Sequence, residues 1–399
     1  MRLLPCLICC LATFPAAGAD DKPAASPVRA GLEAATQARV QASAEVNRAY
    51  DELNAANLPG ATKAAREQAI DDRWDAAIVP SMEALLAAAT DHPGDPASVE
   101  ALGFVALNAR GRPSDLSLRA IRILRRDHAR AANISAATRT MFVHEGKPEA
   151  IDLIRAVVAE NPSRAERGRA AHDLAWLLQY RASRIERRRD QTSSPPPAPH
   201  LQGVDPAPIR AEVEALYDRC VAEFADVPLV GYGAGKTVGD FARGALVDLR
   251  SLRVGLPAPE IVGQDVDGHP LRLTDHRGKA VVLVFSGEWC GPCRANAGFL
   301  RDLLAPEAQA RTPCVVLEVN TDKTPDPVRQ AMAAGAITWP CWMDGDVTGP
   351  ITLAWGVEEF PRFYVLDAAG IIRGKDVDGK ALAAVVARTV AEHPADRRP

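Results

Sequence analysis

Hydrophobic residues recur at helical spacing through the first half of the chain and form continuous apolar runs nearer the C-terminus. In residues 24–190 apolar side chains repeat three or four residues apart and no run alternates with period two, so this region is predicted to be all helix. Further helical stripes cover 209–224 and 238–252. Beyond them, β-branched runs at 281–285 and 315–319 alternate with helical stretches, which predicts an α/β domain.

Turns recur at nearly regular intervals in the helical half. The turn-forming sequences around His92, His128 and Asn161 lie 36 and 33 residues apart. This period is similar to that of tetratricopeptide-like helical hairpins, although the Trp and Gly positions typical of that repeat are absent. We therefore predict a helical-hairpin domain over residues 20–190, with an irregular helical bundle as the alternative.

A proline-rich stretch separates this domain from the rest of the chain. Residues 191–208 contain three consecutive prolines and are predicted to form an extended linker. Residues 209–253 are then expected to form a helical connector, and residues 254–399 the α/β domain. The chain is thus predicted to be a multidomain protein with an all-α N-terminal region and an α/β C-terminal region.

The N-terminus has the pattern of a secretory signal peptide, which we assign to residues 1–19. Arg2 precedes an apolar run from Leu3 to Phe14, and Ala17, Gly18 and Ala19 supply small residues for cleavage. The apolar run is too short to span a membrane. We expect an exported protein, soluble after cleavage, in the periplasm or another extracytoplasmic compartment.

Composition narrows the function further. The 399 residues carry a formal net charge of −4 and are 47% hydrophobic and 25% charged, as in ordinary globular proteins. Such a charge provides no strong basic field, so nucleic acid is not an expected partner. Three of the eight cysteines lie within the predicted signal segment, which leaves five in the mature chain. Since five is odd, at least one thiol is unpaired within the chain.

The motif Trp289-Cys290-Gly291-Pro292-Cys293 follows a predicted strand and opens a predicted helix. A thiolate at the first cysteine would lie at the helix N-terminus, where free N–H groups favour negative charge and lower a thiol pKa from its usual ~8.5. Cys290 is therefore predicted to be the attacking nucleophile and the more exposed cysteine. Cys293, one turn on, would resolve the mixed disulfide, while Gly291 and Pro292 hold the turn.

The alternatives for this motif are a plain structural disulfide or half of a zinc site. A zinc site needs a second ligand pair, and no other Cys-x-x-Cys or spaced His pair occurs. We therefore expect no metal and no cofactor, because the Cys290–Cys293 pair itself carries the electrons.

Residues 254–393 resemble the thioredoxin superfamily, and most closely the exported redoxin (TlpA-like) branch. The stretches that carry the resemblance are Gly255–Pro259, Asp267–Gly268, Leu273–Gly278, Trp289–Cys293 and Trp355–Pro361. The resemblance implies a thioredoxin-like fold and a cis-proline at Pro361, facing the cysteine pair and touching the substrate backbone.

Three departures from the family pattern leave roles open. Thioredoxins have a buried Asp where this chain has Val284, and some exported relatives have a Glu where it has Asn296. The proton acceptor for Cys293 is therefore open; Glu318, an acid inside an apolar strand, is a candidate, and a solvent-facing Glu is the alternative. The third departure is Arg362, which replaces the common Thr after the cis-proline.

The cation at position 362 would either stabilise the Cys290 thiolate or steer an acidic substrate, and an ordinary surface Arg is the alternative.

Cys314 and Cys341 each begin an apolar run that the resemblance makes a parallel neighbour of the other. We predict a structural Cys314–Cys341 disulfide, with two buried thiols as the alternative. Cys220 lies in an apolar helical stripe and is predicted to be an inert core thiol.

These features together predict an exported thiol–disulfide oxidoreductase that reduces protein disulfides and takes electrons from a donor that the sequence does not identify. A thiol peroxidase is one alternative, but it would need Thr or Ser at the position of Gly287. The other is a redox-sensing interaction protein whose helical half binds a partner protein.

Overall fold

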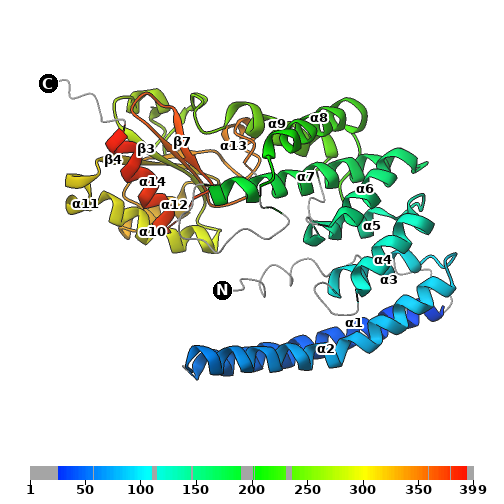
Figure 1. Ribbon diagram of the computed structural model, residues 1–399. Helices are drawn as coiled ribbons and strands as arrows, with labels where there is room; N and C mark the ends of the chain where they lie inside the picture. The colour runs from blue at the N-terminus through cyan, green and yellow to red at the C-terminus, as the bar shows by residue number, and fades with distance from the viewer. Residues whose placement is uncertain are drawn as a thin grey trace. The chain divides into compact units, whose positions relative to one another are not determined.

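The chain divides into two compact units, Met1–Asp240 and Phe241–Pro399. Figure 1 shows the computed structural model with its α-helices and some of its strands labelled. The predicted signal segment lies outside the described residues, as does most of the predicted linker. The structure describes residues 26–56, 58–109, 115–144, 147–189, 201, 203–230, 236–357, 359–377 and 379–392.

The first unit is helical throughout its described residues apart from turns and one isolated bridge, as predicted. Two long helices, α1 and α2, lie side by side as an antiparallel pair in Figure 1. Ser26 caps the first of them by accepting a hydrogen bond from the backbone N–H of Arg29 at 3.0 Å. The helices of this unit are α1 Pro27–Ala55, α2 Gly60–Asp91, α3 Ser98–Asn108, α4 Leu116–Ile123, α5 Ser135–Thr138, α6 Pro148–Glu160, α7 Arg164–Arg189 and α8 Pro206–Phe224, with a π-helical turn Leu124–His128 and a 3-10 turn Arg139–His144.

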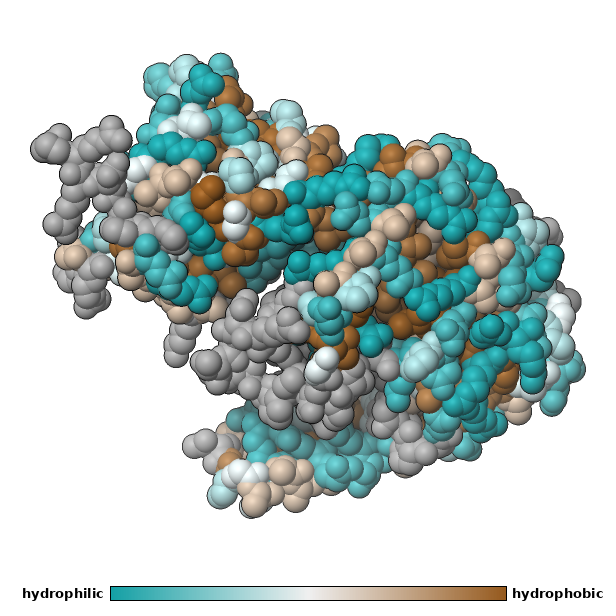
Figure 2. Space-filling view, turned by 45° about the horizontal axis from the view of Figure 1, so that its top comes forward, coloured by the Kyte–Doolittle hydropathy of each residue, from teal (hydrophilic) through white to brown (hydrophobic). Residues whose placement is uncertain are grey.

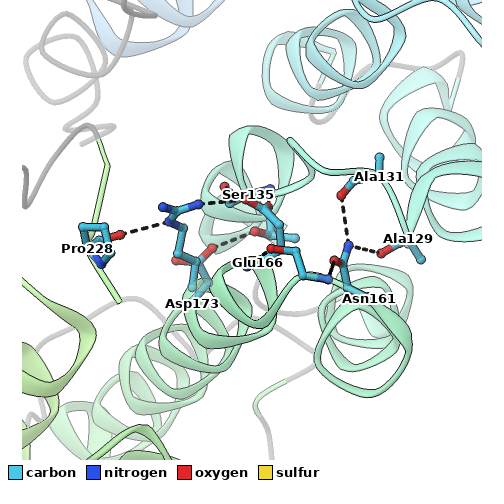
Figure 3. Close-up of polar contacts among 10 residues, drawn as sticks. Ala129, Ala131, Ser135, Asn161, Glu166, Asp173 and Pro228 are labelled. Atoms are coloured by element: carbon cyan, nitrogen blue, oxygen red, sulfur yellow. Dashed lines mark hydrogen bonds and ion pairs between the residues drawn. The ribbon is translucent and has the colours of Figure 1, made fainter. Parts of the chain in front are cut away.

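Polar side chains connect neighbouring turns of the helical unit (Figure 3). The Asn161 amide donates to the carbonyl oxygens of Ala129 and Ala131, each at 2.9 Å. The buried Glu166 carboxylate accepts from the backbone N–H of Ser135 at 2.7 Å. These bonds satisfy polar groups that would be costly to bury unpaired. They tie the turn at Asn161 to the one that follows His128, while a regular hairpin repeat stays a prediction.

The segment expected to be a connector is shared between the two units. Helix α8 packs against α7, and the Tyr217 hydroxyl donates to Gln179 at 2.7 Å. Cys220 lies in the buried stripe of α8, where burial raises the pKa of its thiol to about 12. The apolar stripe of α8 therefore makes it part of the helical unit. Helix α9 (Val238–Ser251) begins at the boundary and continues into the second unit.

The second unit is built on a five-stranded sheet with the order β5-β4-β3-β6-β7. Strands β3, β4 and β5 are parallel, whereas β6 and β7 are antiparallel to their neighbours. All seven residues of β3 are buried, because helices cover both faces of the sheet. The strands are β3 Ala280–Ser286, β4 Cys314–Asn320, β5 Cys341–Met343, β6 Arg362–Leu366 and β7 Ile372–Lys375, with a separate hairpin of β1 Val262–Gln264 and β2 Pro270–Arg272.

Alternate residues of each strand enter two different cores. Val284 and Phe363 belong to one core, together with residues of α10 and α14, whereas Phe285 and Tyr364 belong to the other, together with Trp355. The predicted α/β arrangement is thus confirmed. The helices of this unit are α10 Gly291–Leu304, α11 Pro306–Arg311, α12 Asp326–Ala333, α13 Pro350–Ala354 and α14 Gly379–Glu392, with a 3-10 turn Leu273–His276.

The predicted Cys314–Cys341 disulfide is wrong: both thiols are free and buried. The two strands are parallel neighbours as expected, but the residue opposite Cys341 is Glu318. Cys314 lies four residues before Glu318 on β4, which is about 13 Å along the strand at ~3.3 Å per residue. A disulfide requires Cα atoms within about 7 Å, so the register of the strands forbids the bond.

The face shown in Figure 2 is mostly hydrophilic, with hydrophobic residues in small groups. Among the described helices, none combines the length and the apolar character that crossing a membrane requires. Few large apolar side chains of the described residues are well exposed, and one of them, Trp289, belongs to the cysteine motif.

Candidate active site

The two cysteines of the motif lie at the start of α10, directly after the turn that leaves β3. They form a disulfide with an S–S distance of 2.08 Å. Cys290 is the N-cap residue of the helix, and its sulfur accepts a hydrogen bond from the backbone N–H of Cys293 at 3.2 Å. Free N–H groups at this position favour a negatively charged sulfur. The sequence therefore placed the motif correctly on a strand–turn–helix unit.

Cys290 and Cys293 are equally inaccessible, each 5% exposed, so the expected greater exposure of Cys290 is not observed. The physical reason is that the two sulfurs are bonded and each shields the other.

An aromatic pair flanks the cysteines. Trp289 is 53% exposed, and its ring meets that of Phe360 edge to face, with centroids 5.5 Å apart. The indole N–H of Trp289 donates to the Thr321 hydroxyl at 3.1 Å, which fixes the ring over Gly287. A Cβ atom at Gly287 would overlap this ring. The site therefore has no room there for the Thr or Ser that a peroxidase would need.

Pro361 lies beside the cysteines, and the Phe360–Pro361 peptide bond is cis, as the family resemblance implied. Pro361 and Cys293 line one small cavity of about 10 Å³. The volume is close to the ~10–15 Å³ that a single water molecule occupies by this measure. The cavity is lined by Val284, Ser286, Glu288, Cys293, Asn296, Ala297, Leu300, Glu318, Ile337, Trp339, Pro361 and Phe363.

Glu318 is the most deeply buried acid of this cavity. The residue is 2% exposed, so the solvent-facing alternative is wrong. Its carboxylate accepts hydrogen bonds from the Trp339 indole N–H at 2.8 Å and from the Asn320 amide at 3.0 Å. Burial raises the pKa of Glu318, and the two hydrogen bonds only partly oppose this shift. The side chain is thus an acid with an elevated pKa in the same cavity as Cys293.

A second carboxyl group, Glu288, lines the same cavity and was not singled out from the sequence. It is partly buried, and burial together with the nearby charge of Asp322 raises its pKa. Its backbone N–H donates to the Asp322 carboxylate at 2.8 Å. Glu288 in turn acts to raise the pKa of Glu318 through like-charge repulsion.

Arg362 lies on the opposite face of the sheet from the cavity, because it alternates with Phe363 along β6. Its guanidinium forms ion pairs with Asp248 at 3.0 Å and with Asp376 at 2.7 Å, and it lies over the Tyr364 ring at 5.8 Å. The expectations of a thiolate-stabilising or substrate-steering cation, and of a surface Arg, are therefore wrong. A continuous apolar strand gave no signal of which face this residue occupies.

The site thus brings together Cys290, Cys293, Pro361, Glu318 and Trp289 from the predicted set, with Gly291 and Pro292 forming the first turn of α10. Arg362 and Cys314, which were also predicted, do not belong to this site. Cys341 pairs with Glu318 across the sheet, and burial together with the charge of Glu318 raises the pKa of its thiol well above the ordinary value.

Sequence reasoning missed four residues near the site: Glu288, Thr321, Phe360 and Asp248. Glu288 and Phe360 are next to the named motif and to Pro361, so their positions were available as signals. Thr321 and Asp248 act through contacts 32 and 114 residues away in the chain, which no local pattern reveals. In the described part of the chain, no group of three His, Cys, Asp or Glu side chains is arranged to hold a metal ion.

Comparison with known families agrees with this geometry. Residues 254–375 match the model of the AhpC/TSA family. A thiol-disulfide oxidoreductase, ResA of Geobacillus thermodenitrificans, is 31% identical over 123 residues, which is 31% of this chain and 68% of that protein. The thioredoxin-like protein YneN of Bacillus subtilis is 25% identical over 147 residues, covering 37% of this chain and 82% of that protein.

Among solved structures, the thioredoxin domain of a thiol-disulfide oxidoreductase from Bacteroides vulgatus is similar to 36% of this chain. The match covers 98% of that domain, with 24% identity and a TM-score of 0.31. The two relatives and this solved structure each cover between 31% and 37% of the chain.

Proposed function

Since this chain belongs to the thioredoxin-like thiol–disulfide oxidoreductases of the AhpC/TSA family, we propose that it reduces disulfide bonds in protein substrates through Cys290 and Cys293. The observation that carries the proposal is the position of the Cys290 sulfur. It caps a helix N-terminus, accepts the N–H of Cys293, and lies within bonding distance of a second sulfur. A nucleophile and its resolving thiol require this geometry.

The reaction begins with the reduced pair. The Cys290 thiolate attacks one sulfur of a substrate disulfide, so that a Cys290–substrate bond forms, the substrate S–S bond breaks, and the released substrate thiolate takes up a proton. The Cys293 thiol then loses its proton and attacks the Cys290 sulfur. The Cys290–Cys293 bond forms, and the second substrate thiol is released. The substrate gains two electrons, and the protein is left in the disulfide form described above.

Glu318 is the proposed acceptor of the Cys293 proton. Both groups line the same cavity, whose volume suits one bridging water molecule. An ordinary carboxylate is a weak base, but the raised pKa of Glu318 brings its basicity closer to that of a thiolate. Glu288, at the same cavity and more exposed, would pass the proton on to solvent.

The substrate would lie against Trp289, Phe360 and Pro361. Exposed aromatic rings beside a nucleophile supply apolar contact area at low entropic cost. Trp289 is exposed and its ring meets that of the half-buried Phe360, and Pro361 is next to Phe360 in the chain. This surface is proposed to contact an extended protein segment around a disulfide.

We further propose that the reaction occurs outside the cytoplasm, on the strength of the signal-like pattern in residues 1–19. In an oxidising compartment the Cys290–Cys293 disulfide must be re-reduced after each turnover. The donor is proposed to be a partner dithiol, which attacks Cys290 by the same exchange chemistry in reverse. A protein partner for the helical unit stays a prediction.

The test is reduction of insulin disulfides by the purified protein with dithiothreitol as electron source. Cys290→Ser is expected to abolish the activity and to leave the circular dichroism spectrum unchanged. The matched control is Cys220→Ser, since that thiol is buried in the helical unit and belongs to no part of the site. Full activity of the Cys290 variant would refute the assignment.

A further inference from the structure

Helix α9 contacts the segment that carries Pro361 at two points. The helix precedes residues 254–375, which match the family model, so the family match does not account for it. Gly244 and Asp248 are four residues apart and therefore lie on the same face of the helix. Leu252, directly after the helix and four residues further on, is fully buried in the core beneath that face.

The first contact is between two glycines. The backbone of Gly356 has a φ of +57°, and a Cβ atom there would overlap the carbonyl oxygen of Gly244. Only glycine allows both this conformation and this approach. The helix thus touches the main chain of the Pro361 loop, which we define as the described residues 356, 357 and 359–362, at its first residue.

The second contact is an ion pair at the other end of the same loop. The Asp248 carboxylate accepts from Arg362 at 3.0 Å and from Lys375 of β7 at 3.0 Å. Asp376 completes the cluster through its ion pair with Arg362. The Asp248 and Arg362 side chains are only 12% and 17% exposed, so water screens their attraction weakly. The cluster holds two cations and two anions and is balanced.

The Pro361 loop is therefore held at both ends by one face of α9. Between these ends, Phe360 contacts Trp289 and Pro361 lines the cavity of Cys293. A small displacement of the loop would move both residues relative to the cysteines. From this arrangement we infer that α9, through Asp248 and its pairing with Arg362, positions the Pro361 loop for substrate binding. The inference rests on the proposed function and assigns Asp248 a positioning role in it.

This role differs from a purely stabilising one in what it predicts. If Asp248 only stabilised the fold, its removal would lower the unfolding temperature and leave the kinetic constants of the folded protein unchanged. If it positions the loop, Asp248→Asn raises the KM for insulin about tenfold, since small misplacements of binding groups cost one to two orders of magnitude. The reaction of Cys290 with iodoacetamide, which needs no loop contact, should keep its rate.

The experiment compares KM and kcat for insulin reduction among full-length variants, at a temperature well below the measured unfolding midpoint of each. Arg253→Gln is the matched control, because it removes a charge from an exposed position directly after the same helix. Asp248→Glu retains the carboxylate and is expected to restore most of the affinity. A KM for Asp248→Asn within twofold of the wild-type value would overturn the inference.

Should Asp248→Asn fail to fold, Arg362→Gln tests the same contact from the other side, since it removes the cation that pairs with Asp248. An increase in KM supports the positioning role, and an unchanged KM contradicts it. Failure of the proposed function is recognised separately, because the wild-type protein itself would then show no turnover.

Discussion

Glu318 on β4 lies directly opposite Val284 on β3 in the parallel pairing of the two strands. Both side chains line the cavity of Cys293, and the residues next in the row, Phe363 on β6 and Cys341 on β5, are buried and uncharged. A single carboxyl group thus stands in an otherwise uncharged row across the sheet, beneath the first turn of α10. The position of the Glu318 carboxyl group makes it the proposed proton acceptor in the tests below.

Glu318→Gln is expected to slow the second step of the reaction and to leave the first step unchanged. Without the carboxylate, Cys293 can attack only after losing its proton to solvent, so the rate at pH 7 should fall about 100-fold, the lower end of general-base effects. The loss should shrink as the pH rises towards the range in which free thiols ionise, about 8.5. Single-turnover assays that resolve the mixed disulfide between pH 6 and 9 would measure this.

The matched control is Glu359→Gln, because Glu359 is exposed and adjoins Phe360 of the same loop. It should retain the wild-type pH profile. If both variants lose activity to the same extent, or if the loss in Glu318→Gln does not depend on pH, Glu318 is not the proton acceptor.

Glu288→Gln should keep the activity that depends on Glu318 but shift the pH profile. Glu288 acts to raise the pKa of Glu318 by charge repulsion, so its removal lets Glu318 ionise at lower pH. The acidic limb of the wild-type profile, where Glu318 gains a proton, is therefore expected to move to lower pH. An acidic limb that stays in place or moves to higher pH would contradict the repulsion of Glu318 by Glu288.

Glu318 should also affect stability in a pH-dependent way. Burial raises the pKa of this carboxyl group in the folded state, so the folded protein binds the proton more tightly than the unfolded chain does. Stability is then lost as the pH rises from the unfolded pKa, near 4.3, through the folded pKa, by about 1.4 kcal/mol for each unit between them. Urea unfolding between pH 4 and 8 should show this decline in the wild type and a shallower one in Glu318→Gln. Parallel curves for the two proteins would contradict this.

The three remaining thiols of the described chain should be inert. Cys220, Cys314 and Cys341 are buried, and burial raises the pKa of each. Because alkylation requires a thiolate, iodoacetamide should label none of them in the reduced native protein, and all of them after denaturation. Peptide mass spectrometry distinguishes the sites. Native labelling of Cys314 or Cys341 would show that the core around β4 and β5 opens.

Much of the second unit was predictable because its strands are continuous apolar runs. The run at 281–285 became β3 and the run at 315–319 became β4, each extended by one residue at either end. Since the Cys-x-x-Cys motif lies between such a strand and a helix, its place at a helix N-terminus followed from local pattern alone. The acid at position 318 was noticed for the same reason, as a polar residue inside an apolar run.

The apolar pattern could not predict the register between strands or the face of the sheet on which each side chain lies. A strand buried on both sides has no alternation, so nothing indicated that Glu318 faces the cavity or that Arg362 faces away from it. Cys314 and Cys341 were paired on the assumption that both strands start level, whereas β5 begins opposite the fifth residue of β4. The contact of Asp248 with Arg362 depends on packing between distant segments, which only the folded structure reveals.

The central claim is that Cys290 attacks the substrate and that Cys293 displaces it. The most direct test is to mix the reduced Cys293→Ser protein with a disulfide-containing substrate such as insulin, quench with acid, and map the products by mass spectrometry. A stable mixed disulfide is expected on Cys290 alone, and it should disappear when the second cysteine is restored. No trapped substrate, or substrate trapped on Cys220, Cys314 or Cys341, would contradict it.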